Sequence, residues 1–206
     1  PTDWCHPLLV QPKKGGGVRM CVDLTALNKY VRRPFYPMRT PSQVIGRIPA
    51  GSRYFTSADA ANGYFQLPLD EESQEYTTFM TNWGRYKFLR CPMGLSSSQD
   101  YYDRYGDEAL ENLERTDKLR DDIIVASTSR EQHESDVRAM LERCRKHGIT
   151  LSKHKFVCGK TNIKYVGFMV GKDGIGANPT KMEAIQNFPS PNTQRELRSF
   201  LGLAQQ

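Results

Sequence analysis

The feature that most constrains this chain is an acidic pair, Asp121-Asp122, between two short β-like segments. Residues 116–119 and 123–126 have strand composition, and the three residues between them predict a tight turn. Adjacent carboxylates beside apolar strands are costly unless water or a metal ion solvates them. Another acid, Asp59, directly follows a predicted strand over residues 54–58. If the two strands are neighbours in one sheet, three carboxylates meet at its edge.

Three converging carboxylates repel one another and attract divalent cations. Hard oxygen ligands favour Mg²⁺, with Mn²⁺ as an alternative. Two such ions, about 3.5–4 Å apart, activate an attacking hydroxyl and stabilise a leaving pyrophosphate. Asp is also a common turn residue, so the spacing alone leaves ordinary turn chemistry open.

Positive charge is concentrated in the first quarter of the chain. Residues 1–53 contain nine Lys and Arg against two Asp, a net charge of +7, whereas the whole chain carries +6. This distribution suits a polyanion such as nucleic acid or a nucleoside triphosphate, although a solvated basic face would look the same. No apolar run approaches the roughly 20 residues of a membrane helix, so we expect no membrane partner.

The five cysteines are an odd number and contain no CxxC pair, which predicts free thiols in a reducing, intracellular compartment. The spacing of Cys144, His147, His154 and Cys158 could serve zinc. Buried thiols are the preferred interpretation, because Cys144 lies on the apolar side of a predicted helix and Cys158 in a β-like segment.

Turn and capping residues divide the chain into strands and helices without a regular βαβ order, which favours an α+β fold. Gly15-Gly16-Gly17 predicts a hairpin that carries Lys13 and Arg19 near its tip. Residues 63–69 continue strand 54–58 after a short turn. Two β-rich pieces follow over 76–81 and 84–91, and then a helix over 95–113, with Ser96-Ser97-Ser98 as candidate caps. The capping box Thr128-x-x-Glu131 predicts the next helix, which has Val137, Met140, Leu141 and Cys144 on one side. The last predicted elements are a hairpin over 163–175 and two helices, which begin at Asn178-Pro179 and at Thr193-x-x-Glu196.

Five segments in order resemble the reverse transcriptases of gypsy-type LTR retrotransposons. They read VRMCVDLTALN, YFTSADAANGYFQLPLDEESQEYTTFMTNWGRYKFLRCPMGLSSS, DKLRDDIIV, KYVGFMVGKDGI and LRSFLGLA. The resemblance implies a right-hand polymerase: fingers over 1–53, palm over 54–175 with an interleaved fingers segment at about 70–92, and the start of the thumb over 176–206. It also implies an RNA-directed DNA polymerase, a nucleotidyltransferase that binds a primed RNA or DNA template and dNTPs. The remaining thumb, RNase H and integrase of a pol polyprotein would be further partners, in a cytoplasmic virus-like particle or the nucleus.

The same resemblance assigns roles to individual residues. Asp59, Asp121 and Asp122 would be the catalytic metal ligands for two Mg²⁺ ions, and Ala60 would add a backbone carbonyl. Lys13 and Arg19 would grip the triphosphate, and Tyr64 would exclude a 2′-hydroxyl. The short segment Met93-Gly94 would lie beneath the nucleotide, Val166-Gly167 would form the primer grip, and residues 197–203 would lie in a thumb helix.

The acidic motif departs from the family pattern at two positions. Leu119 stands where the family has an aromatic residue, and Arg120 where a small or apolar side chain is usual. A guanidinium beside Asp121 and Asp122 would compete with a metal ion for the carboxylate oxygens. A second hypothesis is therefore a catalytically decayed or domesticated remnant that keeps the fold and binds nucleic acid without polymerising.

Overall fold

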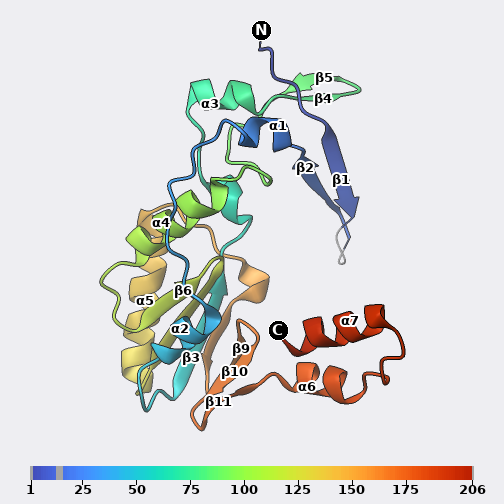
Figure 1. The fold of residues 1–206 in the computed structure, drawn as a ribbon. Helices are drawn as coiled ribbons and strands as arrows, with labels where there is room; N and C mark the ends of the chain where they lie inside the picture. The colour runs from blue at the N-terminus through green and yellow to red at the C-terminus, as the bar shows by residue number, and fades with distance from the viewer. Residues whose placement is uncertain (1, 13–15, 206) are drawn as a thin grey trace. The chain divides into compact units, whose positions relative to one another are not determined.

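The computed structural model describes residues 2–12 and 16–205 (Figure 1). Helices and strands are mixed along the chain, as the α+β prediction requires. Two compact units form, and each collects three separate stretches of sequence. The first unit contains Pro1–Arg39, Ala60–Glu111 and Arg143–Leu151, and the second contains Thr40–Asp59, Asn112–Glu142 and Ser152–Gln206.

The second unit is built on a four-stranded antiparallel sheet in the order β6-β7-β3-β8. Strands 54–58, 116–119 and 123–126 of the sequence prediction are confirmed, and the first and third of them are neighbours. The strands are β3 (Tyr54–Asp59), β6 (Thr116–Leu119), β7 (Asp122–Ser127) and β8 (Val157–Lys160).

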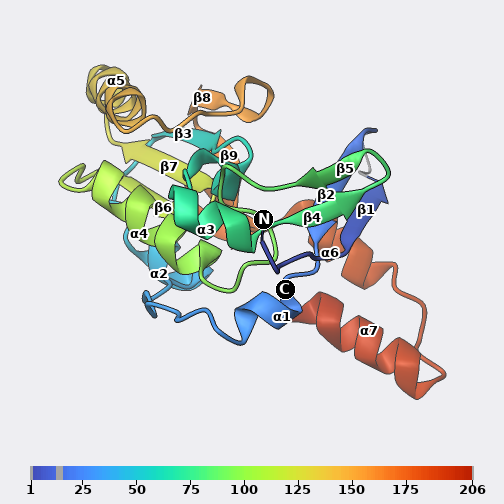
Figure 2. The same cartoon turned by 90° about the horizontal axis from the view of Figure 1, so that it is seen from above.

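Both faces of this sheet are covered. On one face, Phe55, Ile124 and Ala126 pack with α2 (Pro41–Gly46) and with the strands β9 (Asn162–Tyr165) and β10 (Phe168–Gly171). Helix α5 (Arg130–Lys146) lies on the other side of β3 (Figure 1 and Figure 2). Strands β9 (Asn162–Tyr165), β10 (Phe168–Gly171) and β11 (Gly174–Ala177) form an antiparallel three-stranded sheet, which extends the hairpin predicted over 163–175.

Helix α5 differs from its prediction in two details. The capping side chain is Ser129 rather than Thr128, because the helix begins at Arg130 and the Ser129 hydroxyl accepts a hydrogen bond from the backbone N–H of Gln132. Val137, Met140 and Cys144 are buried as expected. Leu141 is 41% exposed, because it lies at the solvent border of the apolar stripe.

The last two helices begin where the sequence predicts. In α6 (Pro179–Gln186), Asn178 caps the backbone N–H of Thr180 and Pro179 occupies the first turn. In α7 (Gln194–Ala204), Thr193 and Glu196 form the reciprocal capping box.

The first unit contains two β-hairpins. The predicted glycine hairpin is confirmed as β1 (Leu8–Pro12) paired with β2 (Val18–Val22), and β4 (Phe79–Thr81) pairs with β5 (Gly84–Tyr86). Their bases share a core in which Val22, Leu24, Leu27 and Phe79 are buried. The short helix α1 (Thr25–Asn28) supplies Leu27 to this core.

Helix α4 (Ser98–Leu110) is held by side chains of residues 31–40, a segment without helix or strand. Arg33 forms an ion pair with Asp100 at 2.9 Å, and the Tyr36 hydroxyl donates to Asp107 at 3.0 Å. The predicted serine cap is only partly right: Ser97 takes the N-cap position without a side-chain hydrogen bond. The region predicted to continue as a strand after residue 62 is instead the 3₁₀ helix η1 (Gly63–Gln66), entered through Asn62 at φ 57°.

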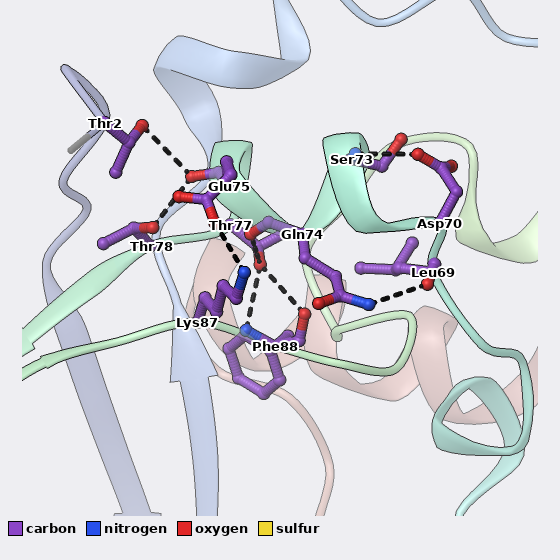
Figure 3. A network of polar contacts seen from close by, with 10 residues as sticks. All are labelled: Thr2, Leu69, Asp70, Ser73, Gln74, Glu75, Thr77, Thr78, Lys87 and Phe88. Atoms are coloured by element: carbon purple, nitrogen blue, oxygen red, sulfur yellow. Dashed lines mark hydrogen bonds and ion pairs between the residues drawn. The ribbon is translucent and has the colours of Figure 1, made fainter.

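A polar network fixes α3 (Glu71–Tyr76) to the β4–β5 hairpin (Figure 3). Asp70 caps the helix by accepting from the backbone N–H of Ser73 at 2.8 Å. The Thr77 hydroxyl donates to the carbonyl of Gln74 at 2.8 Å and accepts from the N–H of Phe88 at 3.0 Å. These bonds join the C-terminal end of α3 to the segment that follows β5 and satisfy polar groups of both.

The cysteines are free thiols among the described residues, but their burial differs from the prediction. Burial raises the pKa of Cys144 to about 11, as expected of a core thiol. Cys158 is exposed, because all four residues of the edge strand β8 lie at the surface.

No helix within residues 2–12 and 16–205 is long and apolar enough to cross a membrane.

Candidate active site

Two of the three candidate carboxylates stand directly opposite each other. Strands β3 and β7 pair antiparallel with Asp59 in register with Asp122. Residues paired in this way lie about 4.5–5.5 Å apart at Cα and point to the same face of the sheet. Because alternate residues share a face, both carboxylates lie on the same face as Phe55 and Ile124, at its end.

Asp121 lies in the turn that joins β6 to β7. Leu119 pairs with Asp122, so Arg120 and Asp121 alone form a two-residue hairpin loop. Arg120 has φ 54°, and positive φ at the first central residue is the requirement of the primed turns that close tight hairpins. The Arg120 side chain is exposed. The predicted turn is confirmed but is shorter than expected, because Asp122 is the first residue of β7 and only Arg120 and Asp121 form the loop.

A lysine that the sequence did not mark lies at this site. Lys155, the last residue of the 3₁₀ helix η2 (Lys153–Lys155), forms an ion pair from Nζ to Asp59 Oδ2 at 2.8 Å. The backbone N–H of Ser152 also donates to the carbonyl of Asp59 at 2.8 Å. The segment Ser-Lys-His-Lys reads as an ordinary solvated run, so only the fold shows that it returns to β3.

The carboxylates and the lysine influence one another. Partial burial raises the pKa of Asp122 above its ordinary value, and the charges of Asp59 and Asp121 raise it further, against the opposing effect of Lys155. The hydrogen bond to Asp59 raises the pKa of Lys155. The site therefore resists carrying all its negative charge unless a cation is present.

The donor set fits a hard divalent cation. Within residues 2–12 and 16–205, no three acidic, His or Cys side chains are already gathered as a metal-binding group. The carboxylate oxygens of Asp59, Asp121 and Asp122 are nevertheless the ligand type that Mg²⁺ prefers. The Lys155 ammonium at 2.8 Å from Asp59 shows that a positive charge is accommodated beside this carboxylate.

A buried polar network lies on the other face of the same strands. His133, 3% exposed, contacts the Thr56 hydroxyl through Nε2 at 2.7 Å and the Ser127 hydroxyl through Nδ1 at 3.0 Å. Asp136 accepts from Ser127 at 2.7 Å and from Arg115 at 2.8 Å. Burial lowers the pKa of His133, so its neutral ring ties β3, β7 and α5 together. Nothing in the sequence around His133 predicts this role.

The candidate primer grip is a tight turn in the same unit. Tyr165 pairs with Phe168, so Val166 and Gly167 form a two-residue loop with φ values of 40° and 93°. Val166 and Phe168 are half-buried against the core cluster that contains Phe55 and Ile124.

The other candidate nucleotide contacts belong to the first unit. Ala60 follows Asp59 in the chain and is buried, with a bridge to Leu151. Tyr64 lies in η1, and its ring meets Tyr102 of α4 edge to face at 5.6 Å. This contact fixes the plane of the Tyr64 ring.

The Met93-Gly94 segment is clamped by an asparagine. Asn28 donates from Nδ2 to the carbonyl of Gly94 at 2.8 Å and accepts from the N–H of Ser96 at 2.8 Å. Gly94 has φ 101°, and a Cβ atom there would lie 3.0 Å from the carbonyl oxygen of Val22. The backbone conformation therefore favours glycine at this position, and the space for a side chain is tight.

Of the two candidate triphosphate-binding cations, Arg19 is exposed on β2 opposite Gln11. Lys13 lies outside the described residues. Arg19 and Gln11 share one face of the hairpin, whereas Val10 and Met20 share the other.

Comparison with known proteins identifies the family. The family model "Reverse transcriptase (RNA-dependent DNA polymerase)" matches residues 11–170. The chain belongs to the reverse transcriptase family. It is 32% identical over 208 residues to the Pol polyprotein of transposon gypsy from Drosophila melanogaster, covering 96% of this chain and 20% of that protein. Transposon 297 of the same organism gives 32% identity over 204 residues, covering 96% and 19%. The chain thus spans about a fifth of the length of these relatives.

Solved structures agree on the fold. A foamy viral protease–reverse transcriptase in complex with dsDNA superposes with a TM-score of 0.91 at 24% identity, covering all of this chain and 43% of that one. Another, in complex with an RNA/DNA hybrid, gives a TM-score of 0.87 at 24% identity, covering 98% and 27%. The palm and fingers architecture expected from the sequence is confirmed.

Proposed function

We propose that this chain is the polymerase domain of a gypsy-type pol polyprotein and extends a primer on an RNA template with dNTPs. The observation that carries the proposal is the register of β3 and β7, which pairs Asp59 with Asp122 beside the turn residue Asp121. Membership of the reverse transcriptase family supports the reaction class.

Three carboxylates of this chain would hold two Mg²⁺ ions, or Mn²⁺ in their place. When bound, these ions lower the pKa of the primer 3′-hydroxyl and neutralise the departing pyrophosphate. Asp59 and Asp122 present their oxygens from rigid strands, which fixes the positions of the ligands. Lys155 neutralises Asp59 in the absence of metal, and its long, 65% exposed side chain is free to swing away.

The remaining site residues would bind and orient the nucleotide and the primer. Arg19 and Lys13 contact the triphosphate, where the Arg fork suits phosphate oxygens. Tyr64, held by Tyr102, excludes a 2′-hydroxyl, and the backbone carbonyl of Ala60 would be a further ligand for one of the two ions. The backbone of Met93-Gly94 lies beneath the nucleotide, and Val166-Gly167 holds the primer end. Base pairing with the template selects the nucleotide, so the protein needs backbone and shape contacts.

The proposed partners follow from the relatives. Two of the solved structures with this fold are complexes, one with dsDNA and one with an RNA/DNA hybrid, which supports a primed RNA or DNA template. The relatives are Pol polyproteins, which supports covalent continuation into the rest of the thumb, an RNase H and an integrase. We keep the division into fingers (1–53 and about 70–92), palm (the rest of 54–175) and thumb (from 176). The proposed location is a cytoplasmic virus-like particle or the nucleus.

Primer extension on a homopolymer RNA template with labelled dNTP tests the proposal. Asp122→Asn keeps the size of the side chain and removes its charge, so extension should fall on the order of 10³-fold or more. Asp70→Asn is the matched control, because it makes the same change of charge at the cap of α3, where Asn keeps an oxygen that accepts the capping hydrogen bond. Equal extension by Asp122→Asn and wild type would refute the assignment.

One observation favours a second function. Arg120 stands in the turn that carries Asp121, directly before the acidic pair in the chain, and its side chain is exposed. A decayed or domesticated remnant would keep the fold and bind a primed template without extending it. Binding of a labelled primer–template by a wild-type chain that extends no primer would identify this alternative.

A further inference from the structure

The hydroxyl of Tyr165 connects the primer-grip turn to the catalytic strand. It donates a hydrogen bond to the backbone carbonyl oxygen of Asp122 at 3.0 Å. Tyr165 is the last residue of β9, immediately before Val166-Gly167. One side chain therefore bridges the start of this turn and the main chain of a catalytic residue.

Packing explains the Tyr165 ring but not its hydroxyl group. The residue is 2% exposed and belongs to the core cluster with Phe55, Ile124 and Ile163. A phenylalanine ring would bury almost the same apolar area there. A buried hydroxyl must find a partner or lose free energy, and this one finds the carbonyl of Asp122.

The turn that follows needs an anchor. Val166 is β-branched and has φ 40°, a conformation that is costly for such a residue and persists only where the surroundings impose it. Gly167 continues the turn at φ 93°. The cluster that holds the Tyr165 ring also receives Val166 and Phe168, so both ends of the turn are fixed to it.

We propose that Tyr165 is a positioning residue that sets the distance between the primer 3′ end and the catalytic carboxylates. Its ring fixes the turn at Val166-Gly167, and its hydroxyl fixes β9 to the main chain of Asp122. A displacement of either element is thereby transmitted to the other. This inference rests on the proposed function, because it takes Val166-Gly167 as the primer grip and Asp122 as a metal ligand.

The test compares Tyr165→Phe with Tyr54→Phe in the full polymerase chain that contains this region. Tyr54 begins β3, at the other end of the strand from Asp59, so its variant reports any general loss on removing a tyrosine hydroxyl. With Tyr165→Phe we expect kcat for correctly paired primers to fall about fivefold to tenfold, as the loss of one hydrogen bond allows. The KM for dNTP and the Kd for primer–template should stay within about twofold of wild type.

Amide exchange supplies a readout that does not depend on activity. With Mn²⁺ as the probe, metal addition should slow exchange at Val166 and Gly167 in the wild-type chain and have a smaller effect in Tyr165→Phe. Wild-type kcat in Tyr165→Phe, or an equal fall in Tyr54→Phe, would overturn the inference. A wild-type chain that extends no primer would instead refute the proposed function. Amide exchange would then decide the inference. If Mn²⁺ slows exchange at Val166 and Gly167 equally in wild type and in Tyr165→Phe, the inference is overturned. If this slowing is lost in Tyr165→Phe, the inference is supported.

Discussion

In strand β7, the five residues that follow Asp122 are all buried, whereas among the ten residues of strands β1 and β2 only Val22 is buried. Strand β7 lies between β6 and β3, and residues on both of its faces are covered. Strands β1 and β2 form a separate two-stranded sheet, with Val10 56% and Val18 59% exposed. The carboxylates thus lie at the end of strands that are buried in one unit, whereas Arg19 lies on an exposed strand of the other unit.

This difference matches what each group must do. A metal site needs ligands at fixed positions, and an interior strand supplies them. A two-stranded hairpin whose strand residues are mostly exposed is marginally stable and has few contacts that oppose movement. A cation that grips a triphosphate can use such a support, because it must close on the nucleotide and then release pyrophosphate.

The largest expected difference is in stability. Ile124→Ala removes a 1% exposed side chain from β7 and should lower the free energy of unfolding by about 2–5 kcal/mol. Val18→Ala in β2 should change it by less than about 0.5 kcal/mol, because Val18 is mostly solvated. Urea titration of both variants measures the difference. Equal losses would show that the hairpin is stabilised by contacts like those of the core.

The next effect concerns the nucleotide. Arg19→Gln removes a charged donor without changing the core, so the KM for dNTP should rise about 10- to 100-fold, as expected for a charge-assisted hydrogen bond. The unfolding midpoint should stay the same. Arg130→Gln, on an exposed turn of α5 where Arg130 pairs with Glu134, is the matched control. An unchanged KM in Arg19→Gln would show that Arg19 lies on a solvated basic face and does not contact the triphosphate.

Sequence reasoning located the carboxylates because their signal is local. Two short apolar segments around an acidic turn have few ways to fold, and Asp59 ends a third segment of the same kind. Lys155 carries no such signal: it lies 33 residues beyond Asp122 in a run of polar residues, and a long-range return of the chain places it beside Asp59. His133 is similar, since a histidine in a charged helix reads as solvated until α5 is docked on β3.

The mistaken details have the same origin. Leu141 and Cys158 fit apolar patterns but lie at edges where the tertiary structure leaves them exposed. Thr128 and Ser129 are both good caps, and the helix begins at Arg130, so that Ser129 is the residue that caps it. Local patterns therefore predict which elements form, and packing decides their borders.

Two carboxylates in different units should respond to pH in opposite directions. The pKa of Asp122 is raised, chiefly by burial, so its contribution to stability improves as pH falls through that pKa. The pKa of Asp70 is lowered, chiefly by hydrogen bonds from Ser73, so its contribution is present above pH 4 and is lost as pH falls. In EDTA at pH 7, Asp122→Asn should therefore raise the Tm, and Asp70→Asn should lower it.

Thermal unfolding between pH 3 and 7 checks these signs. The difference in Tm between each variant and wild type should become smaller as the pH approaches 3, because the wild-type carboxyl groups are then protonated and uncharged like Asn. A lower Tm for Asp122→Asn at pH 7 would show that Lys155 more than compensates the burial of this carboxylate.

The smallest effect is expected at Arg120, in the turn of the rigid hairpin. A unit positive charge about 4 Å from the pair would oppose a metal ion by roughly 4 kcal/mol at an effective dielectric of 20. Arg120 is exposed, and exposed ion pairs retain only about 0.2–1 kcal/mol after screening. Removal of the charge should therefore raise Mn²⁺ affinity and the extension rate about two- to fivefold.

The choice of replacement follows from the backbone at Arg120. Its φ of 54° would be strained for a β-branched residue, so Arg120→Val would confound loss of charge with loss of the turn. Arg120→Met keeps an unbranched Cβ and removes the charge, and Arg120→Lys keeps a charge without the bidentate fork. If competition with the metal is the cause, rates should increase in the order wild type, Lys, Met, and the difference should shrink at high salt because screening weakens the competition. Equal rates for all three would show that the hairpin tolerates a guanidinium at its tip, and the rigid strands alone would then account for the geometry of the carboxylates.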